Sequence, residues 1–246
     1  MEFILEPINQ YVFITTLVPI AAYLIYIYIR DEYKKEPLIA LLAAVLLGVF
    51  SAFILILGDL TEQEAIGRYG FVKWYECWRT GFLSCAVPAE VAKFVALSLF
   101  LFFNKYYDEY VDAVVYSVCI ALGFIGIMNG WYLYNNEDNQ LVQGLLSAFV
   151  LIPAHFTIGT VMGYFFALAK LRHRVYFYLL ALVAAIIVDG CFSSLLLWID
   201  YQASLYVIAI VLLVILSVIM HGLTHGVGIE HLIISDSDKV KNNDCI

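Results

Sequence analysis

A glutamate and a lysine lie one helical turn apart inside an apolar stretch of the chain, CAVPAEVAKFVALSLF. At this spacing, Glu90 and Lys93 share one face of a helix. An ionisable side chain at the centre of a bilayer costs about 2.5–3.5 kcal/mol. A chain that keeps both residues there needs them for a reaction or for an ion pair that packs helices together.

Other apolar stretches also contain ionisable residues. His155 lies in PAHFTIGTV, and Asp189 lies in VDGCFSSLL, where Ser193 follows on the same helix face. Carboxylates and an imidazole can hold a metal ion, or position a water molecule and remove its proton. Taken singly, each residue favours a structural contact between helices. Taken as a set, they favour a water-activating or metal-binding site.

The composition places these residues in a membrane. The chain has 246 residues, of which 63% are hydrophobic and 14% charged, and a soluble domain of this length cannot bury such a composition. The formal net charge of −8 is spread over loops and tail, so nothing indicates a nucleic-acid partner or a polybasic lipid-binding patch. The cysteines form no paired framework and are interpreted as packing residues. They are Cys77, Cys85, Cys119, Cys191 and Cys245.

Seven apolar stretches are long enough to cross a hydrocarbon core of about 30 Å, which takes about 20 residues of helix. They cover residues 9–29, 38–59, 81–103, 111–133, 143–168, 176–199 and 204–221. The sequence therefore predicts an all-α, polytopic membrane helix bundle of about seven transmembrane helices. We expect one transmembrane domain over residues 1–221 and a polar cytoplasmic tail over residues 222–246. The first stretch lacks a small-residue cleavage site and is expected to remain as a membrane helix.

Lysines and arginines predict the orientation of the bundle, because short cytoplasmic loops retain them. In the seven-span arrangement, Arg68, Lys73 and Arg79 fall on one side. The larger group on the other side comprises Arg30, Lys34, Lys35, Lys105, Lys170, Arg172, Arg174, Lys239 and Lys241. We therefore expect the N-terminus to lie outside the cell and the C-terminus in the cytoplasm.

In this topology the four ionisable residues share a depth. At a rise of about 1.5 Å per residue, Glu90 lies about 14 Å from the outward end of its helix, and Asp189 about 15 Å. Lys93 and His155 each lie about 18 Å from that end. Asn129 is shallower, at about 6 Å, where it would line the way in. The spans thus predict a polar centre in the outer half of the bundle.

Five segments, in order along the chain, resemble the motifs of the PrsW-type intramembrane proteases, which are related to the CAAX-processing and bacteriocin-immunity proteases. PAEVAKF resembles the E-E-x-x-K signature of that family, and RDEYKKEP resembles its first loop. YDEYVDAVVYSVCIALGFIGIMNG is similar to the segment that leads into G-F-x-x-x-E-N. PAHFTIGTVMGYFFALAK is similar to the histidine-bearing span, and VDGCFSSLL to the last motif, usually H-G-x-x-D. The resemblance covers about residues 25–200.

The resemblance implies a membrane-embedded site that hydrolyses a peptide bond near the outer membrane surface. The residues that line it would be Glu90, Lys93, Asn129 and His155, with Asp189 in support. Glutamate and histidine would activate water directly or through a metal such as zinc, held by Glu90, His155 and Asp189. The expected substrate is a single-pass membrane protein of the anti-sigma-factor kind. The expected location is the inner membrane of a bacterial cell, with several spans crossing the lipid bilayer.

Some motif positions depart from the family pattern. Ala89 and Met128 stand where the family has glutamates, Asp189 where it has histidine, and Ser193 where it has aspartate. Aspartate can replace histidine as a metal ligand, and serine still hydrogen-bonds. Neither Ala89 nor Met128 can act as a carboxylate, and loss of a general base costs about 10²–10⁴ in rate. Ala89 is either an inactivating substitution or a natural divergence, and Met128 favours divergence.

Two other functions remain open. One is a catalytically inactive relative that binds client membrane proteins, which the missing carboxylates support. The other is a small proton-coupled transporter that uses the charged residues as a relay, ranked lower because no inverted repeat is recognisable. His221 and His225 also share a helix face and can bind metal there. Their place at the end of the last span favours an interfacial helix end.

Overall fold

The computed structural model describes residues 10–30, 36–58, 74–107, 109–135, 140–199, 208 and 210–226. Within these ranges every regular element is a helix, which confirms the predicted all-α class. In chain order they are α1 (Gln10–Arg30), α2 (Leu38–Leu57), α4 (Trp74–Thr80), the π-helical segment η1 (Gly81–Ala86), α5 (Val87–Phe103), α6 (Asp112–Asn135), α7 (Gln140–Leu146), the π-helical segment η2 (Ser147–Leu151), α8 (Ile152–Arg172) and α9 (Tyr176–Ile199). An apolar C-terminal helix, Ile210–Gly226, follows.

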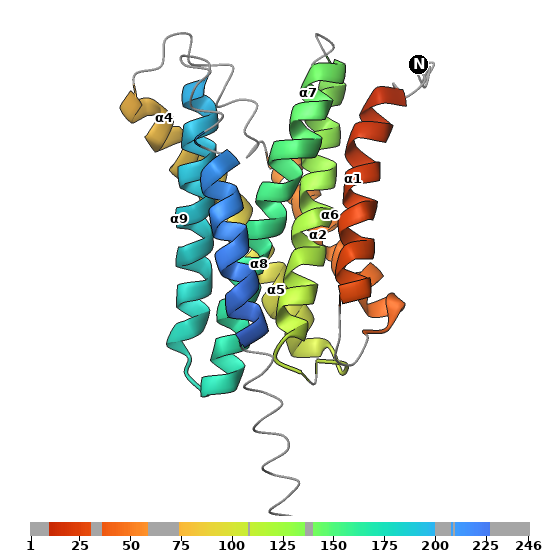
Figure 1. The fold of residues 1–246 in the computed structure, drawn as a ribbon, viewed down its shortest axis with the longest axis vertical. Coiled ribbons are helices and arrows are strands. Elements are labelled where there is room, and N and C mark those ends of the chain that lie inside the picture. The colour runs from red at the N-terminus through yellow and green to blue at the C-terminus, as the bar shows by residue number, and fades with distance from the viewer. Residues whose placement is uncertain are drawn as a thin grey trace, which may run out of the picture.

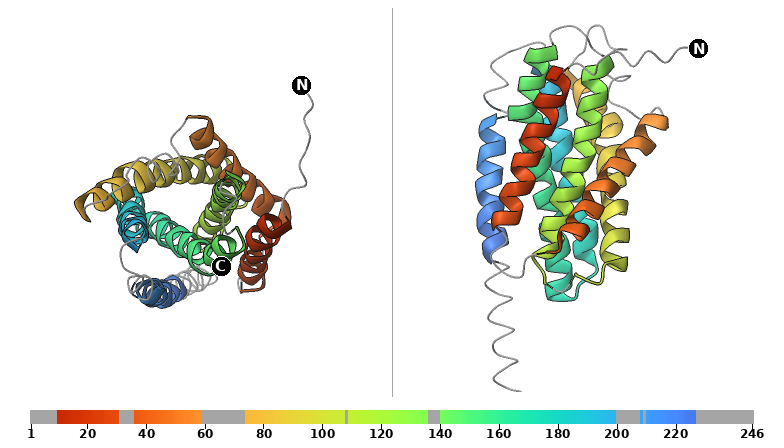
Figure 2. Two further views of the ribbon diagram at one scale, coloured as in Figure 1. Left: turned by 90° about the horizontal axis from the view of Figure 1, so that it is seen from above. Right: turned by 90° about the vertical axis from the view of Figure 1, so that its right-hand side faces the viewer.

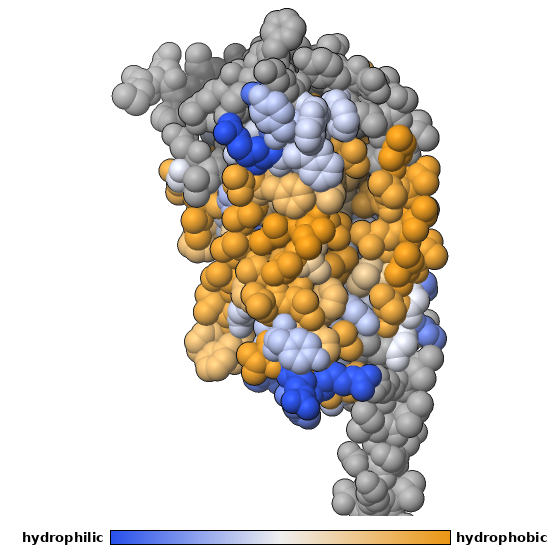
Figure 3. Space-filling view, turned by 90° about the vertical axis from the view of Figure 1, so that its left-hand side faces the viewer, coloured by the Kyte–Doolittle hydropathy of each residue, from blue (hydrophilic) through white to orange (hydrophobic). Residues whose placement is uncertain are grey.

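The helices run side by side along the long axis of the molecule (Figure 1). In the described part of the chain, five helices are long and apolar enough to cross a membrane. They are Leu38–Leu57, Trp74–Phe103, Asp112–Asn135, Leu141–Arg172 and Tyr176–Trp198. The first and last predicted spans correspond to shorter apolar helices, Ile14–Ile29 and Ile210–Gly226. On the face shown in Figure 3, hydrophobic side chains form a belt between two more polar ends. The predicted polytopic membrane bundle is thereby confirmed, since helices satisfy their backbone hydrogen bonds internally in lipid.

Helix α6 forms the core of the bundle. It packs against α2 on one side and α8 on the other, and α9 packs in turn against α8 (Figure 2). Two glycines allow the close approach of α2 and α6, as small residues do in membrane bundles. A Cβ at Gly48 would collide with the carbonyl of Ile120, and one at Gly123 would collide with the carbonyl of Val45. The best-buried span is therefore the one around which the others are arranged.

Two spanning helices contain a π-helical segment in their first half. In Trp74–Phe103, α4 runs through η1 into α5, and in Leu141–Arg172, α7 runs through η2 into α8. Each π segment ends just before a proline, Pro88 or Pro153. Proline lacks an N–H and collides with the carbonyl four residues earlier, so an α-helix must deform at this point. The widened π turn is the form that the deformation takes here.

The two ends of the bundle are distinguished by the helices that begin and end there. One end, called here the N-terminal face, is where α1 and α7 begin and α6 and α9 end (Figure 1). At the opposite end, Lys170 donates hydrogen bonds to the carbonyls of Tyr107 (3.1 Å) and Glu109 (3.3 Å) and lies 3.6 Å from the Tyr107 ring centroid. These contacts fasten the α5–α6 connection to the end of α8. The outward orientation of the N-terminal face stays a prediction, and the tail beyond residue 226 lies outside the described residues.

Candidate active site

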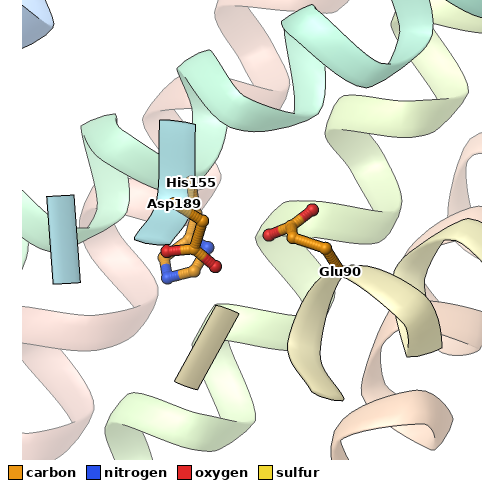
Figure 4. Close-up of side chains that lie close together, drawn as sticks. All are labelled: Glu90, His155 and Asp189. Carbon is orange, nitrogen blue, oxygen red and sulfur yellow. The ribbon is translucent and has the colours of Figure 1, made fainter. Parts of the chain in front are cut away.

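The structure brings Glu90, His155 and Asp189 together from α5, α8 and α9. One ligand atom from each lies within 4.8 Å of those of the other two. Figure 4 shows the Glu90 carboxylate directed toward the Asp189 carboxylate and the His155 ring. Their exposed fractions are 0%, 3% and 1%, so the group is sealed inside the bundle. Of the residues singled out in the sequence, these three form a common centre.

Lys93 joins two members of this centre. Its ammonium forms an ion pair with Glu90 one turn away, and its Nζ lies 3.1 Å from His155 Nδ1. It also lies 5.0 Å from the centroid of the Phe124 ring, within the range of a cation–π contact. An ammonium group only donates hydrogen bonds, so this contact makes Nδ1 the acceptor and places the imidazole proton on Nε2. Lys93 therefore brings positive charge to the centre from within the chain.

The carboxylates of the centre keep oxygens without hydrogen-bond partners. Ser193 donates to Asp189 Oδ1 at 3.1 Å. Glu90 Oε2 and Asp189 Oδ2 are buried and accept no hydrogen bond from the described residues. Leaving a buried polar group unsatisfied costs about 1–3 kcal/mol, and more for a charged group. Buried acceptors of this kind call for a further partner, such as water, substrate or a cation.

The residues present fit a metal ion. Two carboxylates and one imidazole, supplied by three helices, are the donor types and the number found in catalytic zinc sites, which leave a further position open. Coordination through His155 Nδ1 would require the Lys93 ammonium to move aside, because both would use the same nitrogen lone pair. A metal ion bound through Nδ1 would therefore take the place of the Lys93 ammonium.

Ala89 and Met128 lie together in an apolar cluster. Ala89 is 5% exposed and packs with Ala52, Leu55 and Phe124, and Met128 packs against this cluster. Nothing in the sequence places these two motif positions side by side, because one is on α5 and the other on α6. Both positions at which the family resemblance implies a glutamate thus lie among apolar side chains.

Asn129 has its own hydrogen-bond partners. Its Nδ2 donates to Thr16 Oγ1 on α1 at 2.8 Å, and Ser147 Oγ on η2 donates to its Oδ1 at 2.5 Å. None of these contacts involves Glu90, His155 or Asp189. The cluster lies about 9–10 Å from the N-terminal face by helix rise, shallower than Asp189, as the sequence predicted for Asn129. The sequence analysis missed Thr16 and Ser147, for which only their hydroxyls inside apolar spans were a signal.

His221 and His225 lie apart from this centre. They line a cavity of about 370 Å³ together with residues of α1, α6 and α8, among them Phe156 and Thr160. Phe156 and Thr160 project from a different face of α8 than His155 does. In the described part of the chain, the two histidines are not among the clustered metal-ligating side chains.

The amino-acid sequence matches a known family over most of its length. The profile of the PrsW family, described as intramembrane metalloproteases, matches residues 36–220. The chain belongs to the PrsW family. The match includes Glu90, His155 and Asp189, so the buried centre lies within the part of the chain that defines membership. Membership makes this chain a multi-pass membrane protein of a peptidase family.

Bacterial members of the PrsW family are similar over most of their length. Protease PrsW of Clostridioides difficile (strain 630) is 30% identical over 214 residues, which are 85% of this chain and 86% of that protein. Protease PrsW of Bacillus subtilis (strain 168) is 28% identical over 195 residues, 76% of this chain and 84% of that protein. Protease PrsW of Geobacillus kaustophilus (strain HTA426) is 29% identical over 199 residues, with 78% and 84% covered. No solved structure matched significantly.

Proposed function

We propose that this chain is a membrane-embedded endopeptidase that cleaves single-pass membrane proteins near the outer face of a bacterial inner membrane. The observation that carries the proposal is the convergence of Glu90, His155 and Asp189 within 4.8 Å, buried and with unsatisfied carboxylate oxygens. Most buried polar groups in proteins are hydrogen-bonded, so acceptors of this kind call for a partner such as water or substrate. Family membership supports peptide-bond hydrolysis as the reaction.

Each residue has a role that its contacts suggest. Glu90 Oε2 is free to accept a proton from a water molecule and to orient it. His155, with its proton on Nε2, can donate a hydrogen bond to the developing oxyanion. Lys93 holds both side chains in place through its two contacts. Asp189 is held by Ser193 and offers its second oxygen to the centre.

A divalent metal such as zinc gives the alternative arrangement of the same three side chains. Glu90, His155 and Asp189 would hold it, and it would supply Lewis-acid polarisation of the peptide carbonyl. The protein would then contribute the open position, the burial that excludes bulk water, and the Ser193 hydrogen bond that orients one ligand. The family description as metalloproteases supports this component.

The depth of the centre limits where a substrate can be cut. Asp189 lies about 15 Å from the end of α9 at Ile199 and about 20 Å from its start at Tyr176, by helix rise. The scissile bond must therefore lie within the membrane, on the side of the N-terminal face. With that face outward, as the charge distribution predicts, a single-pass substrate of the anti-sigma-factor kind would be cut in its outer half.

A second candidate function follows from the apolar cluster around Ala89. Hydrocarbon at both glutamate positions favours a relative that binds client membrane helices and does not cleave them. For this function we expect an intact client protein to co-purify with the chain and no cleavage product to form.

One experiment separates the two functions. A panel of single-pass reporters is co-expressed with the natural chain and with Glu90→Gln, His155→Ala and Lys105→Ala, the last being a control at the far end of the bundle. Cleavage by the natural chain and the control, with loss in the first two variants, supports the peptidase. Uncut reporter that co-purifies with all four proteins supports the binding function. Equal cleavage by all four proteins overturns the proposed centre.

A further inference from the structure

Glu90 and His155 are presented by the same local arrangement on two different helices. On the first helix, η1 ends at Ala86 and is followed by Val87, Pro88, Ala89 and Glu90. On the second helix, η2 ends at Leu151 and is followed by Ile152, Pro153, Ala154 and His155. In both, the proline comes two residues after the π segment, and the site residue comes two residues after the proline. Helix α9, which carries Asp189, is described as α-helix throughout.

The hydrogen bonds of the two segments show the wide turn directly. The N–H of Val87 donates to the carbonyl of Phe82, and the N–H of Ile152 donates to the carbonyl of Ser147. Both bonds reach five residues back, whereas an α-helix reaches four. Each wide turn holds one residue more than an α-turn. Every side chain beyond it is therefore rotated by about 100° relative to an unbroken α-helix, since successive residues are about 100° apart.

Close contacts fix both π segments to neighbouring helices. A Cβ at Gly81 would collide with Ser194, and a Cβ at Gly190 would collide with the ring of Phe82. Gly190 is the residue after Asp189, so η1 rests on α9 directly beside the third member of the centre. On the other helix, Ser147 of η2 donates to Asn129 of α6. The rotation of each wide turn is thus anchored against a second helix.

We infer that Pro88 and Pro153 are positioning residues for hydrolysis: they prevent the wide turns from closing into α-helix and so direct Glu90 and His155 at Asp189. Without the proline ring, the N–H at position 88 can bond to the carbonyl of Ser84, and that at position 153 to the carbonyl of Phe149. The turn then closes and the site residue rotates away from the centre. The inference rests on the proposed function for the meaning of the centre, but the geometry can be measured independently.

The geometric test uses thiol cross-linking. Glu90→Cys and Asp189→Cys are introduced together in a chain whose natural cysteines are replaced by serine, and a short bifunctional thiol reagent measures their proximity. The same pair is then combined with Pro88→Ala or with Pro19→Ala. Pro19 is a matched control, because it lies inside α1 and no site residue is on that helix. We expect Pro88→Ala to slow cross-linking by about 10-fold or more and Pro19→Ala to leave it unchanged. Equal rates in all three proteins overturn the inference.

A deletion separates positioning from simple loss of folding. Leu83 lies within η1 and is 63% exposed, so its removal costs little packing. In the Pro88→Ala background, deletion of Leu83 removes the extra residue of the turn, and the closed α-helix then directs Glu90 at Asp189 again. We expect the deletion to restore cross-linking that Pro88→Ala alone has lost. A deletion that leaves cross-linking low shows that the wide turn is not what positions Glu90.

A second test measures metal binding and catalysis in chains that keep Glu90, His155 and Asp189. Zinc affinity and the separate values of kcat and KM are measured for Pro88→Ala, Pro153→Ala and Pro19→Ala. We expect the first two variants to lose about 10- to 100-fold in zinc affinity or kcat, the range found when support of a ligand is lost, with KM little changed. If the natural chain neither binds zinc nor cleaves while cross-linking still depends on Pro88, the proposed function fails and the positioning role stands. If the natural chain is active and the proline variants match it, the positioning role fails alone.

Discussion

Ala89 and Met128 pack in one apolar cluster, although they come from different helices and from different motifs. The two carboxylates that the family resemblance implies at these positions are therefore absent from one place in the structure. A single carboxylate placed in this cluster would face Leu55 and Phe124, where burial of an unpaired charge is costly. The shared location favours divergence of the whole pocket over a single inactivating substitution at position 89.

Restoring both carboxylates should raise the rate of cleavage. We expect Ala89→Glu combined with Met128→Glu to increase reporter cleavage by about 10²–10⁴-fold, the contribution typical of a general base. The matched control is Ala92→Glu, which adds a carboxylate on α5 next to the same cluster. The measurement is initial rate of product formation in reconstituted vesicles. An increase in the control as large as in the double variant would show that the two motif positions have no special role.

The ion pair between Glu90 and Lys93 should show strong coupling in stability. Lys93→Met leaves a buried carboxylate without its counter-charge, and removal of one partner of a buried pair typically costs about 3–5 kcal/mol. Adding Glu90→Gln removes the remaining charge, so the double variant should be more stable than Lys93→Met alone. Thermal unfolding in detergent measures all four members of the cycle. Effects that simply add would show that the pair is not coupled.

Zinc should stabilise the natural chain against unfolding. A ligand at 100 times its Kd adds about 2.7 kcal/mol, and a chelator should remove this gain. His155→Ala and Asp189→Asn should lose the response because each lacks one ligand of the centre. The paired variant His221→Ala with His225→Ala should keep it. A response that follows the second pair of histidines instead would locate the metal in the C-terminal helix.

Asn129 should contribute to stability more than to the chemistry. Asn129→Leu removes the side chain to which the hydroxyls of Thr16 and Ser147 are hydrogen-bonded, and unsatisfied buried groups cost about 1–3 kcal/mol each. We expect a lower unfolding temperature with unchanged zinc affinity, measured on the same protein sample. Unchanged stability with a large fall in kcat would instead place Asn129 in the reaction, as the family resemblance implies.

The sequence was sufficient to predict the helices and the convergence of the centre. A rise of about 1.5 Å per residue fixes the depth of a residue once the ends of its helix are known, and this placed Glu90, His155 and Asp189 at one level. The boundaries were less accurate. The span predicted to begin at residue 81 begins at Trp74, because the polar and aromatic residues of α4 lower the hydropathy of a segment that continues the same helix.

Contacts between residues far apart in the chain could not be predicted from the sequence. The Lys93–His155 contact spans 62 positions and the Asn129–Thr16 contact spans 113, and both depend on the rotation of each helix about its axis. For Lys93 on α5 and His155 on α8, that rotation is changed by η1 and η2. Proline marks where a helix deforms, but whether it kinks or widens depends on neighbours such as Ser194 and Phe82, which pack where glycines leave room.

The position of Lys93 on the same helix as Glu90 bears on how the chain is inserted into the membrane. The two charges offset each other one turn apart, so α5 can partition into the bilayer as a nearly neutral segment before other helices arrive. Asp189 has no lysine or arginine on α9 within a turn of it. Asp189 comes close to Glu90 and His155, and so to the side chains that Lys93 contacts, only when α5, α8 and α9 have packed together. We therefore expect stable insertion of α9 to require helices that are already in place.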